Sequence, residues 1–176
     1  MKRLFIVLAV LSCTGLNAYS QAVKYRGNVG IVNQTSTEKE RPTAGVQLLT
    51  SHGIELSKAL FLGLGTGLKY DYYNSVVSVP VFFESQYNVR LKECVVSPFV
   101  GARTGMVFSN EADYSDGVFV SAYMGIAYKH WSFDVGYENQ ISFFQTTLPG
   151  VTGETIRVSQ SRRRDPGLFV GVSFSF

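Results

Sequence analysis

The stretch PGLFVGVSFSF, residues 166–176, alternates between large apolar side chains and small or polar ones. Every second position holds a large apolar residue, namely Leu168, Val170, Val172, Phe174 and Phe176. A period of two is typical of a β-strand with one apolar face. The ends of water-soluble domains are usually polar and loosely held, so the stretch raises the question of which solvent this apolar face meets.

The same period recurs along the chain. Seven further segments alternate, at residues 23–33, 43–51, 59–70, 75–88, 95–108, 118–129 and 131–144. None of them carries a sustained helical period, and no apolar run after residue 23 is long enough for a membrane helix. The chain also holds 17 glycines and 10 tyrosines, a mixture that suits strands and interfacial rings. We therefore predict an all-β domain of eight strands.

The two faces of these strands differ in charge. One set of faces combines glycines with charged residues, which are Lys24, Arg26, Lys69, Glu84, Arg103, Asp134 and Glu138. The opposite faces are apolar over their central spans. A soluble barrel would turn its apolar faces inward and its charges to water. If the charges faced lipid, each Arg or Lys would cost roughly 2–4 kcal/mol at mid-depth, and together they would exceed the ~5–15 kcal/mol of net stability of a domain.

The charge pattern therefore predicts an eight-stranded antiparallel up-and-down transmembrane β-barrel with its apolar faces in lipid. Inside, we expect a lumen charge network in which the arginines pair with the carboxylates: Arg26, Glu84, Arg103, Asp134 and Glu138. Links between strands alternate in length, apart from a short third link, as in membrane barrels. We also expect glycines to make room for bulky lumen neighbours, and Pro80 to mark a bulge or a rim position.

Aromatic residues gather where the boundaries of a membrane would lie. One group comprises Tyr70, Tyr72, Tyr73, Phe143 and Phe144, and the other comprises Tyr87, Tyr128, Trp131 and Phe176.

Residues 1–20 have the layout of a secretory signal peptide, with a basic start, an apolar run from Leu4 to Leu11 and small residues before Gln21. Residues 21–176 then form the exported domain. Lipoprotein processing at Cys13 is the alternative. Cleavage after Ser20 leaves Cys94 as a single cysteine, so no disulfide forms within the domain.

The alternating strands, the ending VGVSFSF (170–176) and the phrases SVPVFFESQYNV (78–89) and SPFVGARTG (97–105) carry a resemblance. The chain resembles small eight-stranded outer-membrane β-barrels of Gram-negative bacteria, in particular OmpA/OmpX-like barrels of the Bacteroidetes type. The resemblance implies an outer-membrane location, periplasmic termini and extracellular long loops. It also implies that the barrel-assembly machinery reads the last strand, with Val172, Phe174 and Phe176 in the signal positions.

Catalytic, metal and cofactor sites are not expected. His130-Trp131-Ser132 superficially resembles the His-x-Ser motif of lipid A deacylases, but both polar residues lie beside a turn and Ser132 has lumen parity. His52 is also predicted to lie in a short turn, so no histidine at the outer rim is expected to supply the base that a nucleophile needs. Two distant histidines and Cys94 lack metal-ligand spacing. Removal of Lys2 and Arg3 with the signal peptide lowers the net charge from +3 to +1, so no basic field for nucleic acid remains.

We expect a non-enzymatic, monomeric barrel with a structural or surface-interaction role, in contact with outer-membrane lipid and lipopolysaccharide. Its candidate contact surface is a long last loop, residues 145–165, that carries Arg157, Arg162, Arg163 and Arg164. Arginine suits phosphates, although a solvated charged loop without a partner is an equal alternative. A narrow pore for small solutes and, less favoured, a lipid A-modifying enzyme are the other functions considered.

Overall fold

The computed structural model describes residues 24–37, 44–57, 59–73, 75–89, 94–109, 116–149 and 155–176, with backbone alone for 143–149 and 155–163. The predicted signal peptide and Cys13 lie outside these residues. No helix among the described residues is both long and apolar enough to cross a membrane.

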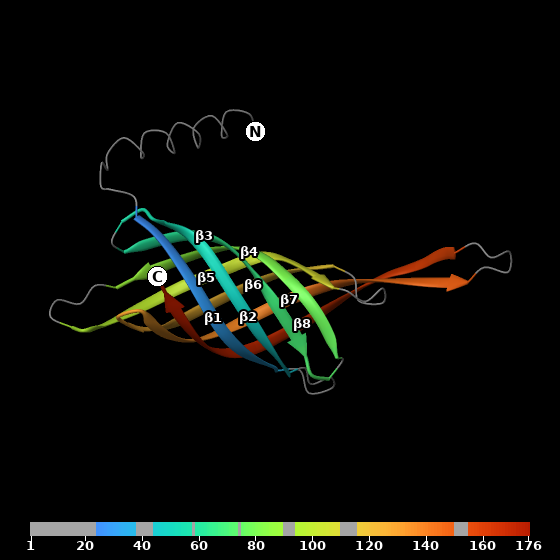
Figure 1. Ribbon diagram of the computed structural model, residues 1–176. Helices are drawn as coiled ribbons and strands as arrows, with labels where there is room; N and C mark the ends of the chain where they lie inside the picture. Colours follow the sequence, from blue (N-terminus) through green and yellow to red (C-terminus); the bar gives the residue numbers. More distant parts are fainter. Residues whose placement is uncertain are drawn as a thin grey trace, which may run out of the picture.

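The strands follow one another in a simple up-and-down order. They are β1 (Lys24–Ser36), β2 (Ala44–Glu55), β3 (Leu60–Asp71), β4 (Val76–Asn88), β5 (Val96–Ser109), β6 (Gly117–Tyr128), β7 (Trp131–Pro149) and β8 (Thr155–Ser175). Each strand pairs with its neighbour in the chain, and β1 pairs antiparallel with β8 to close the barrel (Figure 1). The predicted fold class, an eight-stranded antiparallel barrel, is confirmed.

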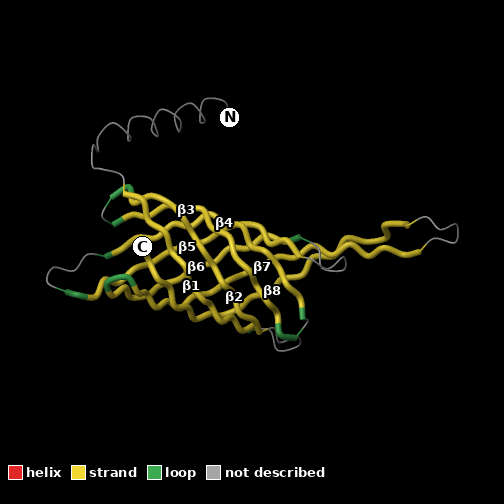
Figure 2. Tube along the Cα trace, in the orientation of Figure 1, coloured by secondary structure: helices red, strands yellow, loops and turns green. Residues whose placement is uncertain are grey.

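The last two strands run on beyond the barrel wall. β7 loses its partner β6 after the pair Gly117↔Ser142, and β8 loses β1 after Ser36↔Gly167. β7 and β8 nevertheless remain paired as far as Pro149↔Thr155 and form a two-stranded ribbon that projects from the barrel (Figure 2). The prediction of a loop over residues 145–165 is therefore wrong for most of that segment. Its threonines and β-branched residues favour strands, although they lack the apolar alternation that marks the barrel strands.

Two other local predictions are also wrong. His52 lies within β2, where it pairs with Gly27 and Leu64, and not in a turn. Pro80 produces no bulge and does not sit at a rim, because the same register holds on both sides of it, at Thr66↔Val81 and at Lys69↔Ser78.

The β3–β4 ladder accommodates Pro80 by a local interruption. Proline has no backbone N–H to donate, and pairing is absent opposite it, between Thr66↔Val81 and Lys69↔Ser78. The hydroxyl of Thr66 donates a hydrogen bond of 2.9 Å to the carbonyl oxygen of Pro80. A side chain thus partly replaces a missing backbone bond between the two strands.

We expect Thr66→Val to lower the free energy of unfolding by about 1 kcal/mol, the net contribution of one hydrogen bond. Urea unfolding of the refolded barrel in lipid vesicles measures the change. Thr104→Val on β5 is the matched control, because Thr104 is outward-facing and exposed. Equal effects of the two substitutions would show that Thr66 does not stabilise the interrupted β3–β4 pairing at Pro80.

The lumen and the outer belt

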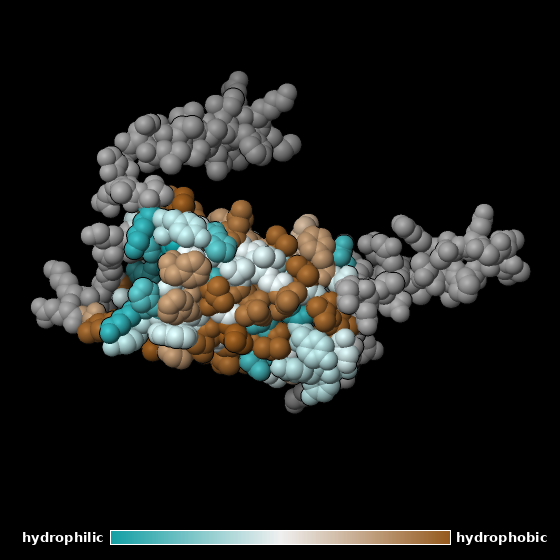
Figure 3. Space-filling model, in the orientation of Figure 1, coloured by the Kyte–Doolittle hydropathy of each residue, from teal (hydrophilic) through white to brown (hydrophobic). Residues whose placement is uncertain are grey.

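The outer surface of the barrel is apolar. Along every barrel strand, exposed and buried residues alternate, and the exposed positions are mostly large hydrophobic side chains. Leu64 is 69% exposed and Met124 is 62% exposed. In a water-soluble protein, large apolar side chains such as these are mostly buried. Apolar side chains cover much of the middle of the face seen in Figure 3. The strands therefore present hydrophobic residues outward, as a lipid-facing wall requires.

Exposed aromatic residues gather at both ends of the barrel. Tyr70, Tyr72 and Tyr73 lie at the end of β3 and in the turn that follows it. The opposite end carries exposed Tyr87, Tyr128, Trp131 and Phe176. These two sets match the predicted interfacial groups, except that the side chains of Phe143 and Phe144 lie outside the described part of the chain.

The middle of the lumen is filled by an aromatic plug. The plug is a cluster of buried side chains that comprises Val32, Leu49, Phe82, Phe99, Val107, Phe119, Tyr123 and Phe169. Phe82 and Phe119 meet edge to face at 6.2 Å between ring centroids, as do Phe99 and Tyr123 at 6.1 Å. An eight-stranded barrel leaves an interior just wide enough for side chains to fill, and here the rings fill it.

Glycines give these rings their space, as predicted. A Cβ atom added at Gly101 would overlap the ring of Tyr123, and one added at Gly65 would overlap the ring of Phe82. The same relation holds between further glycines and rings, namely Gly63 and Phe61, Gly125 and Phe99, and Gly136 and Phe169. The glycines on the inward faces of the strands therefore leave the space that the aromatic rings occupy.

We expect Gly101→Val to lower the free energy of unfolding by about 1–3 kcal/mol, because overpacking would displace Tyr123. Urea unfolding of the refolded barrel measures the loss. In the double variant Gly101→Val with Tyr123→Ala, the combined loss should be smaller than the sum of the two single losses, since the ring that clashes is then absent. A Gly101→Val variant as stable as the wild type would show that the Tyr123 ring can move to another position in the lumen without cost.

The predicted charge network centres on one ion pair beside the plug. Arg103 Nε donates to Glu84 Oε1 at 2.9 Å, and the two side chains are 11% and 4% exposed. The Tyr123 hydroxyl donates to the same carboxylate oxygen at 2.6 Å, while the Arg103 guanidinium lies 4.3 Å from the Tyr123 ring centroid. β4, β5 and β6 thus each supply one member of a buried, mutually satisfied cluster, the Glu84 cluster.

The other predicted members of the network have different partners from those expected. Arg26 Nη1 lies 3.8 Å from Glu55 Oε1, and its guanidinium also donates to Asn28, at 3.0 Å, and to Ser175, at 3.2 Å. Glu138 pairs with Lys69, whose Nζ lies 3.2 Å from Glu138 Oε1. The expectation that arginine pairs with Glu138 is wrong.

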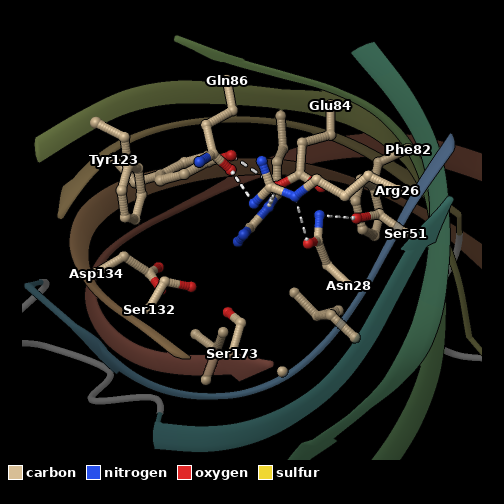
Figure 4. A pocket seen from close by; sticks show the side chains of 15 residues that line it. Arg26, Asn28, Ser51, Phe82, Glu84, Gln86, Tyr123, Ser132, Asp134 and Ser173 are labelled. Atoms are coloured by element: carbon tan, nitrogen blue, oxygen red, sulfur yellow. Dashed lines mark hydrogen bonds and ion pairs between the residues drawn. The ribbon is translucent and has the colours of Figure 1, made fainter. Parts of the chain in front are cut away.

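Asp134 is buried and forms no ion pair with the described residues. Its side chain is 4% exposed, and its Oδ2 atom has no hydrogen-bond partner within the described residues. Asp134 and Ser132 face Arg26, Glu84 and Asn28 across a small cavity (Figure 4). The cavity has a volume of about 20 Å³, which suffices for a single water molecule.

Glu55, Lys69 and Tyr123 are among the lumen residues that the predicted network does not contain. Glu55 was missed because the predicted second strand ended at residue 51, although its parity in β2 is that of the buried Gln47 and Ser51. Lys69 alternates with the outward residues of its strand, so the sequence places it in the lumen. Its partner Glu138 lies on the opposite wall, and the two residues come together only because the barrel closes. The hydrogen bond from Tyr123 to Glu84 depends on the β4–β5–β6 register.

The histidines and Ser132 are not arranged for nucleophilic catalysis. Ser132 faces the lumen and is 6% exposed, whereas His130 lies in the turn before β7 with its Nδ1 2.9 Å from the carbonyl oxygen of Ser175. His52 lies on the outer surface, with Nδ1 2.6 Å from the Tyr25 hydroxyl and Nε2 3.2 Å from Thr50 Oγ1. The Thr50 hydroxyl also donates a hydrogen bond of 3.1 Å to the carbonyl oxygen of Asn28. Within the described ranges, no group of three or more His, Cys, Asp or Glu residues could hold a metal ion.

The candidate contact arginines lie on a strand and not on a loop. Arg157 pairs with Thr147, Arg162 with Phe143 and Arg163 with Ser142, all within the β7–β8 pair. Arg164 pairs with Ile141 and is exposed. Val172 and Phe174 on β8 are each 39% exposed on the outer face, and Phe176, which follows the end of β8, is 56% exposed.

No family model matches the sequence, and no curated protein matches it. Solved structures do match. Neisserial surface protein A (NspA) is 12% identical, with a TM-score of 0.58 over 89% of this chain and 100% of that chain. A de novo designed transmembrane β-barrel is 14% identical, with a TM-score of 0.50 over 86% of this chain and 95% of its own. The N-terminal β-barrel domain of Pseudomonas aeruginosa OprF is 12% identical, with a TM-score of 0.48 over 86% and 97%.

NspA and the designed barrel share the fold of this chain. Together with the apolar outer belt and the charged lumen, this fold defines the class of the protein. It is an eight-stranded antiparallel transmembrane β-barrel.

Proposed function

We propose that the protein is a non-enzymatic outer-membrane barrel with a closed lumen, whose role is structural or lies in contacts at the cell surface. The observation that carries the proposal is the combination of a lipid-facing apolar belt with a plug of buried rings inside. In the proposed orientation the ends of the domain face the periplasm, and the β7–β8 ribbon projects from the outer surface of the cell.

The plug argues against the alternative of a narrow pore. Beside the plug, the cavity between Arg26 and Asp134 has a volume of only about 20 Å³, room for one water molecule and not for a passing solute. We expect the purified barrel to give no conductance above background in planar bilayers. Steady conductance that changes when Glu84 or Arg103 is substituted would support the pore instead.

The β7–β8 ribbon is the proposed contact surface. Arg157 and Arg162 lie on the part of β8 that stands clear of β1 and whose partner β7 has left β6. Arg163 and Arg164 lie at the base of the ribbon, opposite Ser142 and Ile141, which still pair with β6. Guanidinium groups bind phosphate and carboxylate through paired hydrogen bonds. We propose that the ribbon contacts anionic groups, either of lipopolysaccharide or of an opposing surface.

Cell fractionation and gel mobility test this proposal. The wild type should fractionate with the outer membrane and migrate differently before and after heating, as folded barrels do. A variant with residues 146–159 replaced by Asn-Gly joins the paired residues Gln145 and Gln160 by a two-residue turn. This variant should fold and lose only the part of the binding to anionic vesicles that Arg157 supplies, because Arg162, Arg163 and Arg164 remain. A second variant keeps the full ribbon and changes its four arginines to glutamine, and it should lose most of the binding. Binding retained by both variants would refute the ribbon contact, and an inner-membrane or soluble location would refute the proposed function.

The outer face of β8 is proposed to guide insertion by the barrel-assembly machinery. Phe174 and Phe176 expose their rings there, so Phe176→Ala should slow insertion by that machinery into proteoliposomes, with Tyr87→Ala as an exposed aromatic control. Equal insertion rates would argue against the signal.

A further inference from the structure

The outer belt contains a trough across five strands, from β5 to β8 and on to β1. It has a volume of about 950 Å³. Its walls are two cross-strand rows of outward side chains. One row consists of Val100, Met124, Val135, Val170 and Asn33, and the other consists of Pro98, Ile126, Phe133, Val172 and Ile31.

The floor of the trough is the row between these walls. That row holds Phe99, Gly125, Asp134 and Gly171, whose side chains, where present, turn into the lumen. Bare backbone is therefore open to the outside between the two walls. Four strand-to-strand steps give the trough a length of about 19 Å. Because the strands of a membrane barrel tilt by roughly 35–45°, the trough spans roughly 11–13 Å along the membrane normal, which fits within the ~15 Å that one leaflet of a ~30 Å hydrocarbon core provides.

One polar side chain breaks the apolar lining. Asn33 faces outward at the β1 end of the trough, it is exposed, and its amide makes no hydrogen bond to the described residues. An amide without a partner is unfavourable in an apolar environment, because its donors and its acceptor remain unsatisfied. Two other outward polar side chains differ from Asn33, since the Thr66 hydroxyl and the Thr50 hydroxyl each reach a backbone carbonyl.

An elongated apolar trough with a hydrogen-bonding group at one end matches an acyl chain that ends in an ester or amide linkage. The amide of Asn33 offers two donors and one acceptor oxygen to such a linkage. A second copy of this chain is a poorer occupant. A two-fold contact would place one hollow against another and leave a void where protein interfaces are close-packed.

We propose that the trough binds an acyl chain of lipid A, with the chain's ester or amide linkage hydrogen-bonded to Asn33. The choice of lipid A over a phospholipid rests on the proposed outer-membrane orientation. Asn33 lies three residues before Ser36, where β1 ends toward the link to β2. In that orientation this end of β1 meets the outer leaflet. The trough is open to the bilayer along its whole length because it is part of the lipid-facing belt.

Native mass spectrometry of the full refolded chain in detergent tests the site, with purified lipid A and phosphatidylethanolamine titrated separately. Lipid A should bind saturably. Asn33→Leu should weaken that binding about fivefold, as the loss of one hydrogen bond implies. Val135→Trp should weaken it at least about tenfold, because the indole would fill the trough. The matched controls are Thr35→Leu, on the same strand outside the trough, and Val79→Trp on β4, and neither should change binding.

A second readout separates ligand binding from folding. Without lipid A, Asn33→Leu should raise the stability of the barrel in phosphocholine micelles, because it removes an unsatisfied amide, while the affinity for lipid A falls. If Asn33→Leu lowered both the affinity for lipid A and the stability of the barrel, the proposal would be overturned. It would also be overturned if neither Asn33→Leu nor Val135→Trp changed the affinity for lipid A. Equal binding of phosphatidylethanolamine with the same dependence on Asn33 would overturn the lipid A assignment. A dimer abolished by Val135→Trp would identify a second copy as the occupant. These outcomes are independent of the cell fraction in which the protein is found, which tests the proposed function alone.

Discussion

Replacing Glu84 with glutamine should lower the free energy of unfolding by about 3–5 kcal/mol, because Arg103 would keep its charge in the lumen without its partner. Both side chains are buried, at 4% and 11% exposure, and Glu84 also accepts the hydroxyl bond of Tyr123. Urea unfolding in lipid vesicles, followed by tryptophan fluorescence, measures the loss. Trp131 lies on the outer face and reports the transition without taking part in the Glu84 cluster.

The matched control is Glu55→Gln at the mouth of the barrel. Glu55 is 3.8 Å from Arg26 and its side chain is 28% exposed, and Arg26 keeps its hydrogen bonds to Asn28 and Ser175 when Glu55 is changed. We therefore expect a loss of at most about 1 kcal/mol, as for a long ion pair with a partly solvated carboxylate. The double variant Glu84→Gln with Arg103→Met should recover much of the stability of Glu84→Gln, because no unpaired charge remains inside. Similar losses at Glu84 and Glu55 would contradict the view that the Glu84 cluster organises the lumen.

Replacing Val81 with arginine should lower the free energy of unfolding by roughly 2–4 kcal/mol, the penalty for a cation at the middle of the lipid face. Val81 is 47% exposed, faces outward and lies near the centre of β4. Reversible folding into vesicles of defined lipid provides the measurement.

The control for this substitution is Tyr73→Arg, in the turn that follows β3. Tyr73 is 63% exposed at the end of the barrel, where the penalty falls to about 0–1 kcal/mol. A cation tolerated equally at both positions would mean that residue 81 meets water, and the assignment of the lipid face would be wrong.

Alternation in the sequence was sufficient to predict which side chains face outward. The observed β3, Leu60–Asp71, differs by one residue at each end from the predicted 59–70, and its leucines are outside as expected. The prediction succeeds because a single residue of slip would exchange every inward residue with an outward one. The alternation does not predict the β7–β8 ribbon. Residues beyond the barrel have no inward and outward side, so their sequence carries no alternation.

The partners within the lumen could not be predicted to the same degree. The pair Arg103–Glu84 follows from strands that are neighbours in the chain, and the two residues are opposite each other in the β4–β5 register. The pair Lys69–Glu138 joins β3 to β7 across the lumen, so it depends on closure and on side-chain length. Asn33 gave no signal in the sequence, because its significance depends on the trough that five strands form around it.

The central claim is that the apolar face of each strand touches hydrocarbon while the charged face is enclosed. Spin labels placed singly at residues 132–138 of β7 in vesicles, in a Cys94→Ser background, test it directly. The account predicts that labels at Phe133, Val135 and Tyr137 are accessible to oxygen dissolved in the bilayer and shielded from a water-soluble nickel complex. Labels at Ser132, Asp134 and Glu138 should be shielded from both. Access of the nickel complex to Phe133, Val135 and Tyr137, with no period of two in either profile, would contradict the account.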